Sequence, residues 1–389
     1  MPGRSLPTTP AVLILGTGPA GLALAWALKQ RGGASLLLEK GPEVAHSWAR
    51  MPASLKLLSP WKANCLPSGG ASAHPPNHEM AGREYGGLLQ DYARRHELAV
   101  VTNAEVRAVA AASDKGFVVH TSAGTFTAPL LVNATGYFAA PFTPEFPGAR
   151  AAALPQFHFA DYRDAEHLRS VTGKSSPLVL IVGKRLSAGH ALMEFAEAGF
   201  QVALSCRGPI QFGSGPIGWW IFFRLHPALE RIKLFLFGSS ARGVETRMPG
   251  GRARHLVESG SVPVFPDIAR FEGRRVTFTD GRTLEPDAVL YATGFRPALA
   301  HLASLGLAID PQTGRPALRG FESAEVPGLF FLGLDRLRNF RSRFLRGIRE
   351  DAPLLAAELA NRVGAPSSRS ARISAAANTP SRSSALQSA

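Results

Sequence analysis

The feature that most constrains the fold is a glycine-rich loop placed between a short apolar run and an alanine-rich run. Residues 11–15 are all apolar, and residues 16–21 read Gly-Thr-Gly-Pro-Ala-Gly, with the spacing Gly-x-Gly-x-x-Gly. Pro19 stands where a helix would place its first residue, and residues 22–28 continue as an apolar run of helical type. The pattern predicts a strand, a tight turn and a helix whose N-terminus offers N–H groups to a pyrophosphate.

A second apolar run supports a nucleotide-binding function for this loop. Residues 36–38 are Leu-Leu-Leu and lead directly into Glu39, which lies 23 residues after Gly16. An acid at about this distance accepts a hydrogen bond from a ribose 2′-hydroxyl in dinucleotide-binding folds. The alternative is a glycine-rich turn that only packs a helix on a strand, and the acid favours the dinucleotide site over it.

The same plan recurs in the second half of the chain. Residues 178–182 form a buried apolar run, a short loop begins at Gly183, and residues 188–198 have the pattern of an amphipathic helix. Each half also contains a predicted β-hairpin and then an apolar run that ends in Ala-Thr-Gly, at residues 134–136 and 292–294. The chain therefore predicts two dinucleotide-binding modules and two dinucleotides.

The residue that follows the second strand of each module indicates which dinucleotide binds. The first module has Glu39 there, whereas in the second module residues 201–206 lead to Arg207, 24 residues after Gly183. Because an acid accepts from a 2′-hydroxyl and an arginine pairs with a 2′-phosphate, the first module fits FAD and the second fits NADPH. A solvated charge at a strand end is the alternative for Arg207.

The second loop departs from the glycine pattern at its middle position. Arg185 stands where the first loop has Gly18, so close approach of the backbone to a phosphate is partly blocked. Arg185 and Lys184 could instead reach the pyrophosphate with their own side chains. The alternative is a site that binds the nucleotide weakly or not at all.

Composition excludes several other classes of protein. The formal net charge is +14, but only eight of the 43 basic residues are Lys, and no dense basic block with interleaved aromatics indicates a nucleic-acid site. The two cysteines, Cys65 and Cys206, form no Cys-x-x-Cys pair, so no disulfide framework, dithiol centre or metal site is predicted. Without a signal-peptide pattern or an apolar run of ~18 residues, we expect a soluble, cytoplasmic protein.

With both loops, both Ala-Thr-Gly turns and Glu39 in place, the chain resembles the class B flavoprotein monooxygenases, the group of flavin-containing and Baeyer-Villiger monooxygenases. It is most similar to the YUCCA-type indole-3-pyruvate monooxygenases, over about residues 10–362. Further matches are Pro-Glu-Phe-Pro-Gly at 144–148 and Pro-Gly-Leu-Phe-Phe-Leu-Gly at 327–333.

The fingerprint of this family is Phe-x-Gly-x-x-x-His-x-x-x-Tyr/Phe, and the chain keeps half of it. His158 and Tyr162 stand in register, whereas Ala152 and Leu154 occupy the Phe and Gly positions. For His158 and Tyr162 two roles stay open, a catalytic one and a hinge contact that orients the linker between domains.

The resemblance implies an α/β fold with two Rossmann-like dinucleotide-binding domains, of the glutathione-reductase type. The FAD domain would comprise residues 10–150 and 288–364, and the NADPH domain, residues 151–287, would be inserted in it. Residues 209–250 would form an apolar helical insertion in the NADPH domain, and residues 365–389 a disordered tail.

The resemblance also implies which residues hold the cofactors. The glycines of the first loop and Glu39 would hold the ADP moiety of FAD, with the backbone of Val106 beside the adenine, and the second loop and Arg207 would hold NADPH. Trp48 and Trp61 either wall the flavin ring or fill the core. The full set of expected cofactor-binding residues is Gly16, Gly18, Pro19, Ala20, Gly21, Glu39, Lys40, Trp48, Val106, Thr135, Gly183, Lys184, Arg185, Ser187, Ala188, Arg207, Thr293 and Arg343.

The activity that the resemblance implies is insertion of one oxygen atom from O2 into a small organic substrate. NADPH would reduce FAD, and O2 would add to the reduced ring as a C4a-(hydro)peroxyflavin, while the protein supplies orientation and excludes water. No dedicated acid or base is required, so no catalytic residue is assigned. The alternatives are an NADPH:acceptor reductase or oxidase, and a flavin-binding module with a degraded NADPH site.

Two further segments are candidates for positioning the flavin and the substrate. Residues 343–352 precede the last predicted helical run, 353–360, and a helix start aimed at the flavin would stabilise negative charge on the reduced ring. A solvated helical face is the alternative for its arginines. Residues 217–237 are apolar and aromatic but interrupted by charges, and we predict that they roof a pocket for an apolar or aromatic substrate. Core packing, a homodimer face or contact with a membrane surface are the alternatives.

Overall fold

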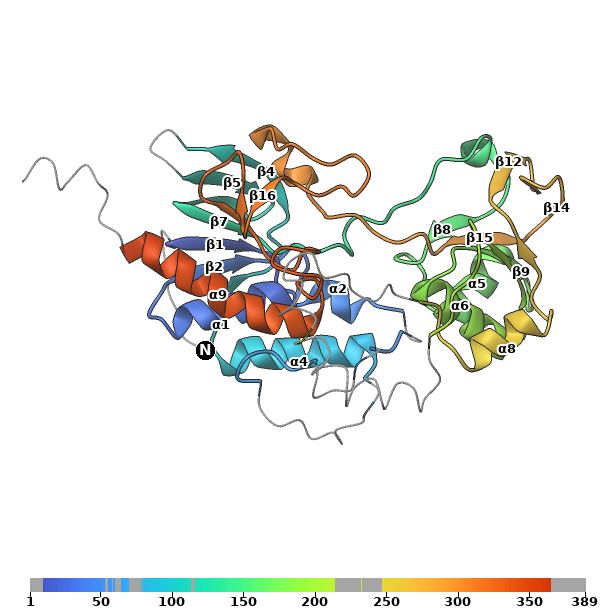
Figure 1. The fold of residues 1–389 in the computed structure, drawn as a ribbon, viewed down its shortest axis with the longest axis horizontal. Coiled ribbons are helices and arrows are strands. Elements are labelled where there is room, and N and C mark those ends of the chain that lie inside the picture. The colour runs from blue at the N-terminus through green and yellow to red at the C-terminus, as the bar shows by residue number, and fades with distance from the viewer. Residues whose placement is uncertain are drawn as a thin grey trace, which may run out of the picture.

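The computed structural model describes residues 10–364, with gaps at 53–54, 58, 60–63, 70–77, 79, 113–115, 214–231 and 233–246. Figure 1 shows two lobes, each built on its own sheets and joined by two segments of chain. Trp61, most of the insertion and the tail lie outside the described residues, so what the sequence predicts for them stays a prediction.

The main sheet of the first lobe has seven strands in the order β16-β17-β18-β7-β1-β2-β3. Its centre is β1 (Val12–Leu15), which lies between β2 (Ser35–Leu38) and β7 (Leu130–Asn133) and is parallel to both. β1 and β7 are buried along their whole length, which explains why they are apolar without alternation, apart from Asn133 at the end of β7. The strands that complete this sheet are β3 (Val100–Val101), β16 (Leu318–Arg319), β17 (Glu322–Ser323) and β18 (Leu329–Phe331).

Helices and a small second sheet cover this main sheet. α1 (Pro19–Lys29) packs against α9 (Leu345–Gly364), and its alanines let it lie almost fully buried. α4 (Gly82–Arg95) lies beside α1 and contacts the short helix α2 (His46–Ala49). The small antiparallel sheet consists of β4 (Val106–Ala111), β5 (Phe117–Thr121) and β6 (Gly124–Ala128), and η3 (Ala300–Leu305) packs on β4.

The second lobe repeats this plan on a smaller scale. Its five-stranded parallel sheet has the order β11-β10-β9-β15-β8. The bounds of these strands are β8 (Gln156–His158), β9 (Leu178–Val182), β10 (Gln201–Ser205), β11 (Val264–Phe265) and β15 (Ala288–Tyr291). An antiparallel sheet follows, with β12 (Ile268–Glu272), β13 (Arg275–Phe278) and β14 (Thr283–Leu284). The helices are η1 (Ala149–Ala151), α5 (Ala165–Thr172), α6 (Leu186–Glu197) and α8 (Arg252–Glu258).

The central strands of the two main sheets are therefore arranged in the same order. In each, the first strand of the module lies between the second strand and the strand that ends in Ala-Thr-Gly, so β1 corresponds to β9 and β7 to β15. Strand order reverses at this point, and ligands of open α/β sheets bind beyond the carboxyl ends of the strands there. The strands of the second lobe all fall between β7 and β16, so this lobe is inserted in the first.

Two antiparallel linker segments connect the lobes. The amide N–H of Phe142 donates to the carbonyl of Gly294, and that of Arg296 donates to the carbonyl of Ala140, each at 2.9 Å. The hydroxyl of Thr135 donates to the carbonyl of Ala298 at 2.9 Å. The linkers are thus held to each other next to the two Ala-Thr-Gly turns.

The structure corrects two local predictions. The last helix begins at Leu345 and not at residue 353, and Pro353 lies inside it. Proline removes one helical hydrogen bond and its ring crowds the carbonyl four residues earlier, and the packing of α9 on α1 offsets this cost. In addition, β12 pairs with β13 as a third strand of the second hairpin sheet, which the sequence pattern did not indicate.

No helix within the described part of the chain is long and apolar enough to cross a membrane.

Candidate dinucleotide-binding sites

A cavity of about 2220 Å³ lies where the carboxyl ends of the central parallel strands of both main sheets face the linkers. Pockets for one small ligand measure about 300–1,000 Å³, so this cavity has room for more than one. All expected cofactor-binding residues line it except Gly21 and Ala188, which occupy the same position in the two loops. The tertiary structure thus brings the two predicted sets together around one space.

Gly21 and Ala188 lie beneath their loops for a packing reason. A Cβ on Gly21 would lie 2.0 Å from the carbonyl oxygen of Gly16, so only glycine fits there. Ala188 is fully buried at the equivalent place in the second loop. These two residues hold a helix close to a strand and do not face the cavity.

The first loop presents open backbone to the cavity at the start of α1. Gly16 has a φ of +99°, which only glycine adopts without strain, and Gly18 is the residue before the first turn of the helix. A Cβ on Gly18 would meet nothing within 4 Å. This empty space beside the positive end of a helix fits a pyrophosphate group.

Glu39 is held in place at the end of β2 by donors from the chain itself. Its Oε2 accepts from the hydroxyl of Thr17 and, at 3.3 Å, from the Thr17 amide, and its Oε1 accepts from the Gly41 amide at 3.1 Å. Two carboxylate oxygens offer about four acceptor sites, so a ribose hydroxyl can still be accepted. The carboxylate lines the cavity while only 6% of the residue is exposed. The residues of the first module therefore fit the ADP moiety that the sequence predicts.

The second loop has the same backbone course but a different lining. Arg185 precedes α6 in extended conformation, as Gly18 precedes α1, so its side chain begins where the first loop leaves open space. Lys184 does not extend toward the helix start, because its Nζ donates to the carbonyls of Arg207 at 2.6 Å and Pro209 at 3.3 Å. Of the two predicted pyrophosphate-binding cations, only Arg185 stays a candidate.

The strand register changes how Arg207 is compared with Glu39. Leu15 pairs with Leu38 in the first sheet and Val182 with Ser205 in the second, so the position of Glu39 corresponds to Cys206. Arg207 follows one residue later and corresponds to Lys40. Its side chain is 76% exposed, and its Nε lies 3.7 Å from Oδ2 of Asp267.

The structure adds two residues to the second module that the sequence pattern did not indicate. Asp267 and Ile268 line the cavity where β11 leads into β12, as Glu105 and Val106 do where β3 leads into β4. By this equivalence, Ile268 takes the place that the first module gives to Val106. The sequence did not indicate these two residues because the strand before them, β11, has only two residues and gives no recognisable apolar pattern.

Aromatic side chains line the cavity at the linkers. The ring of Phe138 lies edge-to-face against Trp48 and Phe295, with centroid distances of 5.8 and 5.3 Å. Trp48 also packs on Tyr85 at 4.8 Å. Trp48 packs against the core and also lines the cavity, so both predicted roles stay open for it.

The two fingerprint residues lie in the second lobe and do not line the cavity. Tyr162 is buried against Phe195, and its hydroxyl donates to Glu194 of α6 at 2.5 Å. His158 lies at the hinge, with its ring 4.9 Å from that of Phe295, and burial lowers its pKa. This geometry favours the hinge alternative over a catalytic role for both.

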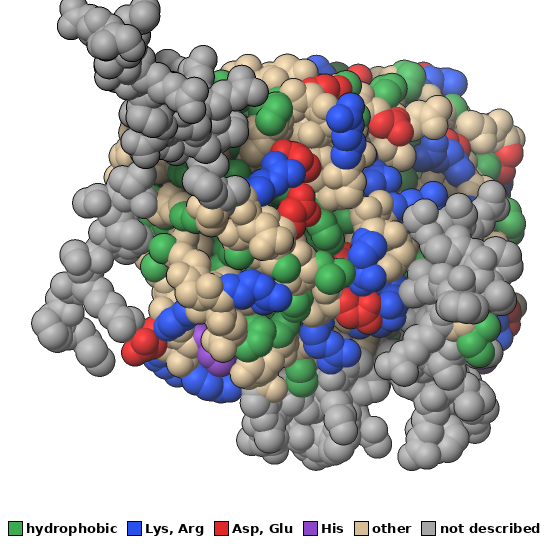
Figure 2. All heavy atoms as spheres, turned by 60° about the vertical axis from the view of Figure 1, so that its left-hand side comes forward, with side chains coloured by type: hydrophobic (Ala, Val, Ile, Leu, Met, Phe, Trp, Pro, Cys, Tyr) green, Lys and Arg blue, Asp and Glu red, His purple; other side chains and the backbone are tan. Residues whose placement is uncertain are grey.

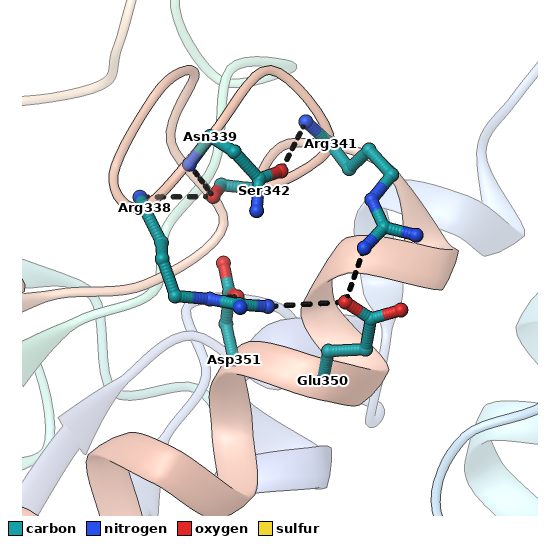
Figure 3. A network of polar contacts seen from close by, with 6 residues as sticks. All are labelled: Arg338, Asn339, Arg341, Ser342, Glu350 and Asp351. Carbon is teal, nitrogen blue, oxygen red and sulfur yellow. Dashed lines mark hydrogen bonds and ion pairs between the residues drawn. The ribbon is translucent and has the colours of Figure 1, made fainter. Parts of the chain in front are cut away.

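The loop before α9 is tied together by charged and polar contacts (Figure 3). Arg338 donates to Asp351 at 2.8 Å and to Glu350 at 3.0 Å, and Arg341 donates to Glu350 at 2.7 Å. The hydroxyl oxygen of Ser342 accepts from the Arg338 amide at 3.1 Å. These contacts hold the N-terminal end of α9 beside the cavity, which Arg341, Arg343, Arg346 and Arg349 line.

Two other kinds of site find no support in the described part of the chain. No group of three or more His, Cys, Asp or Glu side chains is placed there to hold a metal ion. On the face shown in Figure 2, the described Lys and Arg side chains are interspersed with acidic and hydrophobic ones rather than gathered in one band.

Comparison with known proteins places this geometry in context. Residues 13–231 match the family model of the pyridine nucleotide-disulphide oxidoreductases. The chain is 27% identical over 359 residues to an uncharacterized oxidoreductase CzcO-like of Geobacillus kaustophilus, and the alignment covers 90% of this chain and 98% of that protein. It is 28% identical over 325 residues to the indole-3-pyruvate monooxygenase YUCCA6 of Arabidopsis thaliana, with coverage of 73% and 75%.

Solved structures share the fold. A flavin-containing monooxygenase from Stenotrophomonas maltophilia superimposes with a TM-score of 0.76 at 23% identity, covering 92% of this chain and 99% of that one. The bacillithiol disulfide reductase of Staphylococcus aureus superimposes with a TM-score of 0.71 at 18% identity and with the same coverage. The predicted α/β fold with two Rossmann-like domains and the predicted resemblance to the class B monooxygenases are confirmed. The domain boundaries and the individual cofactor contacts stay predictions.

Proposed function

The chain belongs to the pyridine nucleotide-disulphide oxidoreductase family, and we propose that it is an FAD- and NADPH-dependent monooxygenase that transfers one oxygen atom from O2 to a small apolar or aromatic substrate. One observation carries this proposal: two equivalent nucleotide loops open into the same cavity. Two dinucleotides bound there would place a hydride donor and a flavin within one space. When bound, the flavin supplies hydride acceptance and oxygen activation, which amino-acid side chains do not provide.

In this proposal, the residues of the first module bind and orient FAD. The first turn of α1 binds the pyrophosphate through main-chain N–H groups, and Glu39, fixed by Thr17 and Gly41, accepts from a ribose hydroxyl. Because Gly18 leaves open space, the phosphates can approach the backbone closely.

The residues of the second module bind NADPH less through backbone and more through cations. Arg185 meets the pyrophosphate at the start of α6, and Arg207 binds the 2′-phosphate at the end of the second strand. The N-terminus of α9 and the arginines beside it line the cavity and would stabilise negative charge on a bound flavin.

The lining of the cavity supports an apolar or aromatic substrate. Trp48, Phe138 and Phe295 present rings there, and Phe138 is 41% exposed although it is apolar. Rings that surround a bound molecule also exclude water, which limits wasteful release of peroxide. The name of the YUCCA relatives makes indole-3-pyruvate the first substrate to test.

The decisive experiment measures how oxidation of NADPH is coupled to product. The FAD-loaded protein is mixed with NADPH in aerated buffer, with and without indole-3-pyruvate and a panel of aromatic and apolar compounds. NADPH, O2, hydrogen peroxide and product are quantified, and the flavin spectrum is followed by rapid mixing. Product formed in proportion to NADPH supports the monooxygenase, and a slowly decaying oxygenated flavin supports the intermediate that the resemblance implies.

Two other outcomes would replace the proposal. Peroxide formed in proportion to NADPH with every compound would indicate a reductase or oxidase. Absence of flavin reduction would indicate a flavin-binding module, the alternative that Arg185 at the middle position of the second loop favours. A cytoplasmic location, a homodimer and a substrate roof at 217–237 also stay proposals.

A further inference from the structure

The two nucleotide loops differ in the positive charge that they offer to a diphosphate. The second loop carries Lys184 and Arg185, whereas residues 16–21 contain no basic side chain. The diphosphate of a dinucleotide carries two negative charges, and the main-chain N–H groups at a helix start offer only partial charges to them. A full positive charge for the first module therefore has to come from another segment that lies against its loop.

The segment that follows β2 places His46 against this loop. The amide of Ala45 donates to Oγ1 of Thr17, inside the loop, at 2.9 Å. Ala45 adopts a φ of +58°, which residues other than glycine rarely adopt, and its bond to Thr17 holds this turn at the start of α2. The imidazole of His46 then packs on Gly41, where a Cβ would lie 2.2 Å from Cγ of the ring.

The surroundings of the His46 ring favour its protonated form. Nδ1 is buried and lies 3.6 Å from Oε1 of Glu43, and a carboxylate at this distance stabilises a positive ring. The side chain lines the cavity and is 18% exposed, so a ligand in the cavity can reach it. His46 can therefore supply the charge that the first loop lacks.

His46 is also the group at this place whose charge changes near neutral pH. Carboxylates, lysines and arginines as classes keep their charge between about pH 5.5 and 8.5, whereas histidines titrate there. Among the described residues two histidines line the cavity, and burial lowers the pKa of the other, His301, to about 4. The charged groups around His46 are Glu39 and Lys40 at the end of β2, Glu43 before α2, Arg50 after it, Glu105 and Arg107 near the start of β4, and Arg83 and Glu84 on α4, the latter paired with His78.

We propose that His46, in its protonated form, is a further residue that binds the diphosphate of FAD, so that FAD affinity depends on pH. This inference rests on the proposed function, in which the first module binds FAD. The amide of Gly41, on which the imidazole packs, also holds Glu39 at 3.1 Å, so the ring lies beside the expected places of ribose and diphosphate. A positive charge there attracts the diphosphate even without a direct hydrogen bond, because water is partly excluded from the site.

The test measures the binding of FAD to the full-length apoprotein, by quenching of flavin fluorescence, between about pH 5.5 and about pH 8.5. The diphosphate of FAD stays fully ionised over this range, so a change in affinity reports the protein. We expect the wild type to bind FAD about tenfold more tightly at the acidic end. The affinity of His46→Gln should change less than about threefold, and His46→Lys, which keeps a positive charge, should bind tightly at both ends.

Competition against FAD separates the diphosphate from the rest of the cofactor and confines the measurement to the first module. ADP-ribose, which contains the diphosphate, should show the pH dependence of FAD, whereas adenosine should show none. The matched control is His120→Gln, because His120 is exposed on β5 and is not part of the cavity lining. This control should keep the wild-type profile, and the melting temperature of each apoprotein checks its fold.

The outcomes separate the inference from the proposed function. Equal pH dependence in the wild type and His46→Gln would overturn the inference and leave the proposed function intact, as would a wild-type affinity that does not change with pH. If His46→Gln does not fold, His46→Lys decides: affinity that stays high at about pH 8.5 supports the inference, and affinity that still falls overturns it. A wild type that binds no FAD at any pH would contradict the proposed function, and the inference with it.

Discussion

A Cβ placed on Gly16 would lie 2.8 Å from the carbonyl oxygen of Ala134, and the second module repeats this contact, at 2.5 Å, between Gly183 and Ala292. Each loop is therefore seated directly on the Ala-Thr-Gly turn that ends the strand beside it. The recurrence of a loop glycine and an Ala-Thr-Gly turn in both halves reflects this packing. The glycines of the first loop therefore have separable roles. A Cβ on Gly16 or Gly21 would clash with backbone, whereas a Cβ on Gly18 would meet nothing within 4 Å.

Substitution of Gly18 should separate cofactor binding from stability. We expect Gly18→Ala to change the free energy of unfolding of the apoprotein by less than about 0.5 kcal/mol, because the new methyl meets nothing within 4 Å. Its FAD affinity should fall about tenfold, because the methyl keeps the pyrophosphate from the backbone. The matched control is Gly21→Ala, whose methyl would lie 2.0 Å from the Gly16 oxygen and should destabilise the apoprotein by about 3 kcal/mol. Urea unfolding measures the stability of the apoproteins, and flavin fluorescence measures FAD affinity. Equal stability of Gly18→Ala and Gly21→Ala would contradict the separate roles of the two glycines.

Removal of Arg207 should weaken NADPH binding without affecting FAD. Arg207→Ala loses a charge-assisted bond of about 1.5–3 kcal/mol, so the dissociation constant for NADPH should rise roughly 10- to 100-fold. Its ion pair with Asp267 is exposed, so the melting temperature should stay close to that of the wild type. Stopped-flow reduction at several NADPH concentrations, with FAD content measured in parallel, tests this; unaltered NADPH affinity would remove Arg207 from the site.

The pair of Arg338 and Asp351 should be important for stability. Asp351 is fully buried, and Arg338→Met would leave its carboxylate without the guanidinium that it accepts from. We expect a loss of about 3 kcal/mol in the free energy of unfolding. The control is Arg254→Met, which breaks the exposed pair with Glu258 and should cost less than about 1 kcal/mol. Similar unfolding midpoints in urea for both variants would show that burial of Asp351 does not matter.

His301 should make stability decrease in mild acid. Burial lowers its pKa from 6.5 to about 4, and a ring nitrogen lies 3.0 Å from Oδ1 of Asn133. The unfolded chain therefore binds a proton at this residue below pH 6.5, whereas the folded chain does so only below about 4, so the free energy of unfolding falls as the pH is lowered between these values. His301→Gln keeps an N–H donor but does not titrate. Its free energy of unfolding, measured by urea titrations, should therefore fall by about 2 kcal/mol less than that of the wild type between about pH 7 and about pH 4.5. If the free energy of unfolding of both proteins fell equally with pH, groups other than His301 would be responsible.

The elements nearest the predicted sites could be derived from sequence because their signals are local. β1, β9 and β15 are apolar throughout and β7 is apolar up to Asn133, and nearly all of their residues are buried, as central parallel strands require. Gly16 and Gly183 could be located because a turn with positive φ and close backbone contact admits no other residue. The third strand of the second module, β11, has only two residues and is too short to give such a signal.

The start of α9 shows the limit of local patterns. Pro353 predicts a helix start at that residue, but the helix begins at Leu345 and runs through the proline. The buried contact of α9 with α1, and the bonds of Arg338 and Arg341 to Glu350, hold the earlier turns. Helix α1 lies more than 300 residues before Pro353 in the chain, and Arg338 and Arg341 lie outside α9, so a local pattern around Pro353 does not include them.

The sequence by itself determined that the chain forms two nucleotide-binding modules, because glycine spacing, apolar runs and the acid Glu39 are properties of single segments. Only the tertiary structure decided that both loops face one cavity, and that the counterpart of Glu39 is Cys206 rather than Arg207. Register between strands depends on backbone hydrogen bonds across the sheet, and counting residues along a loop of variable length does not reveal it.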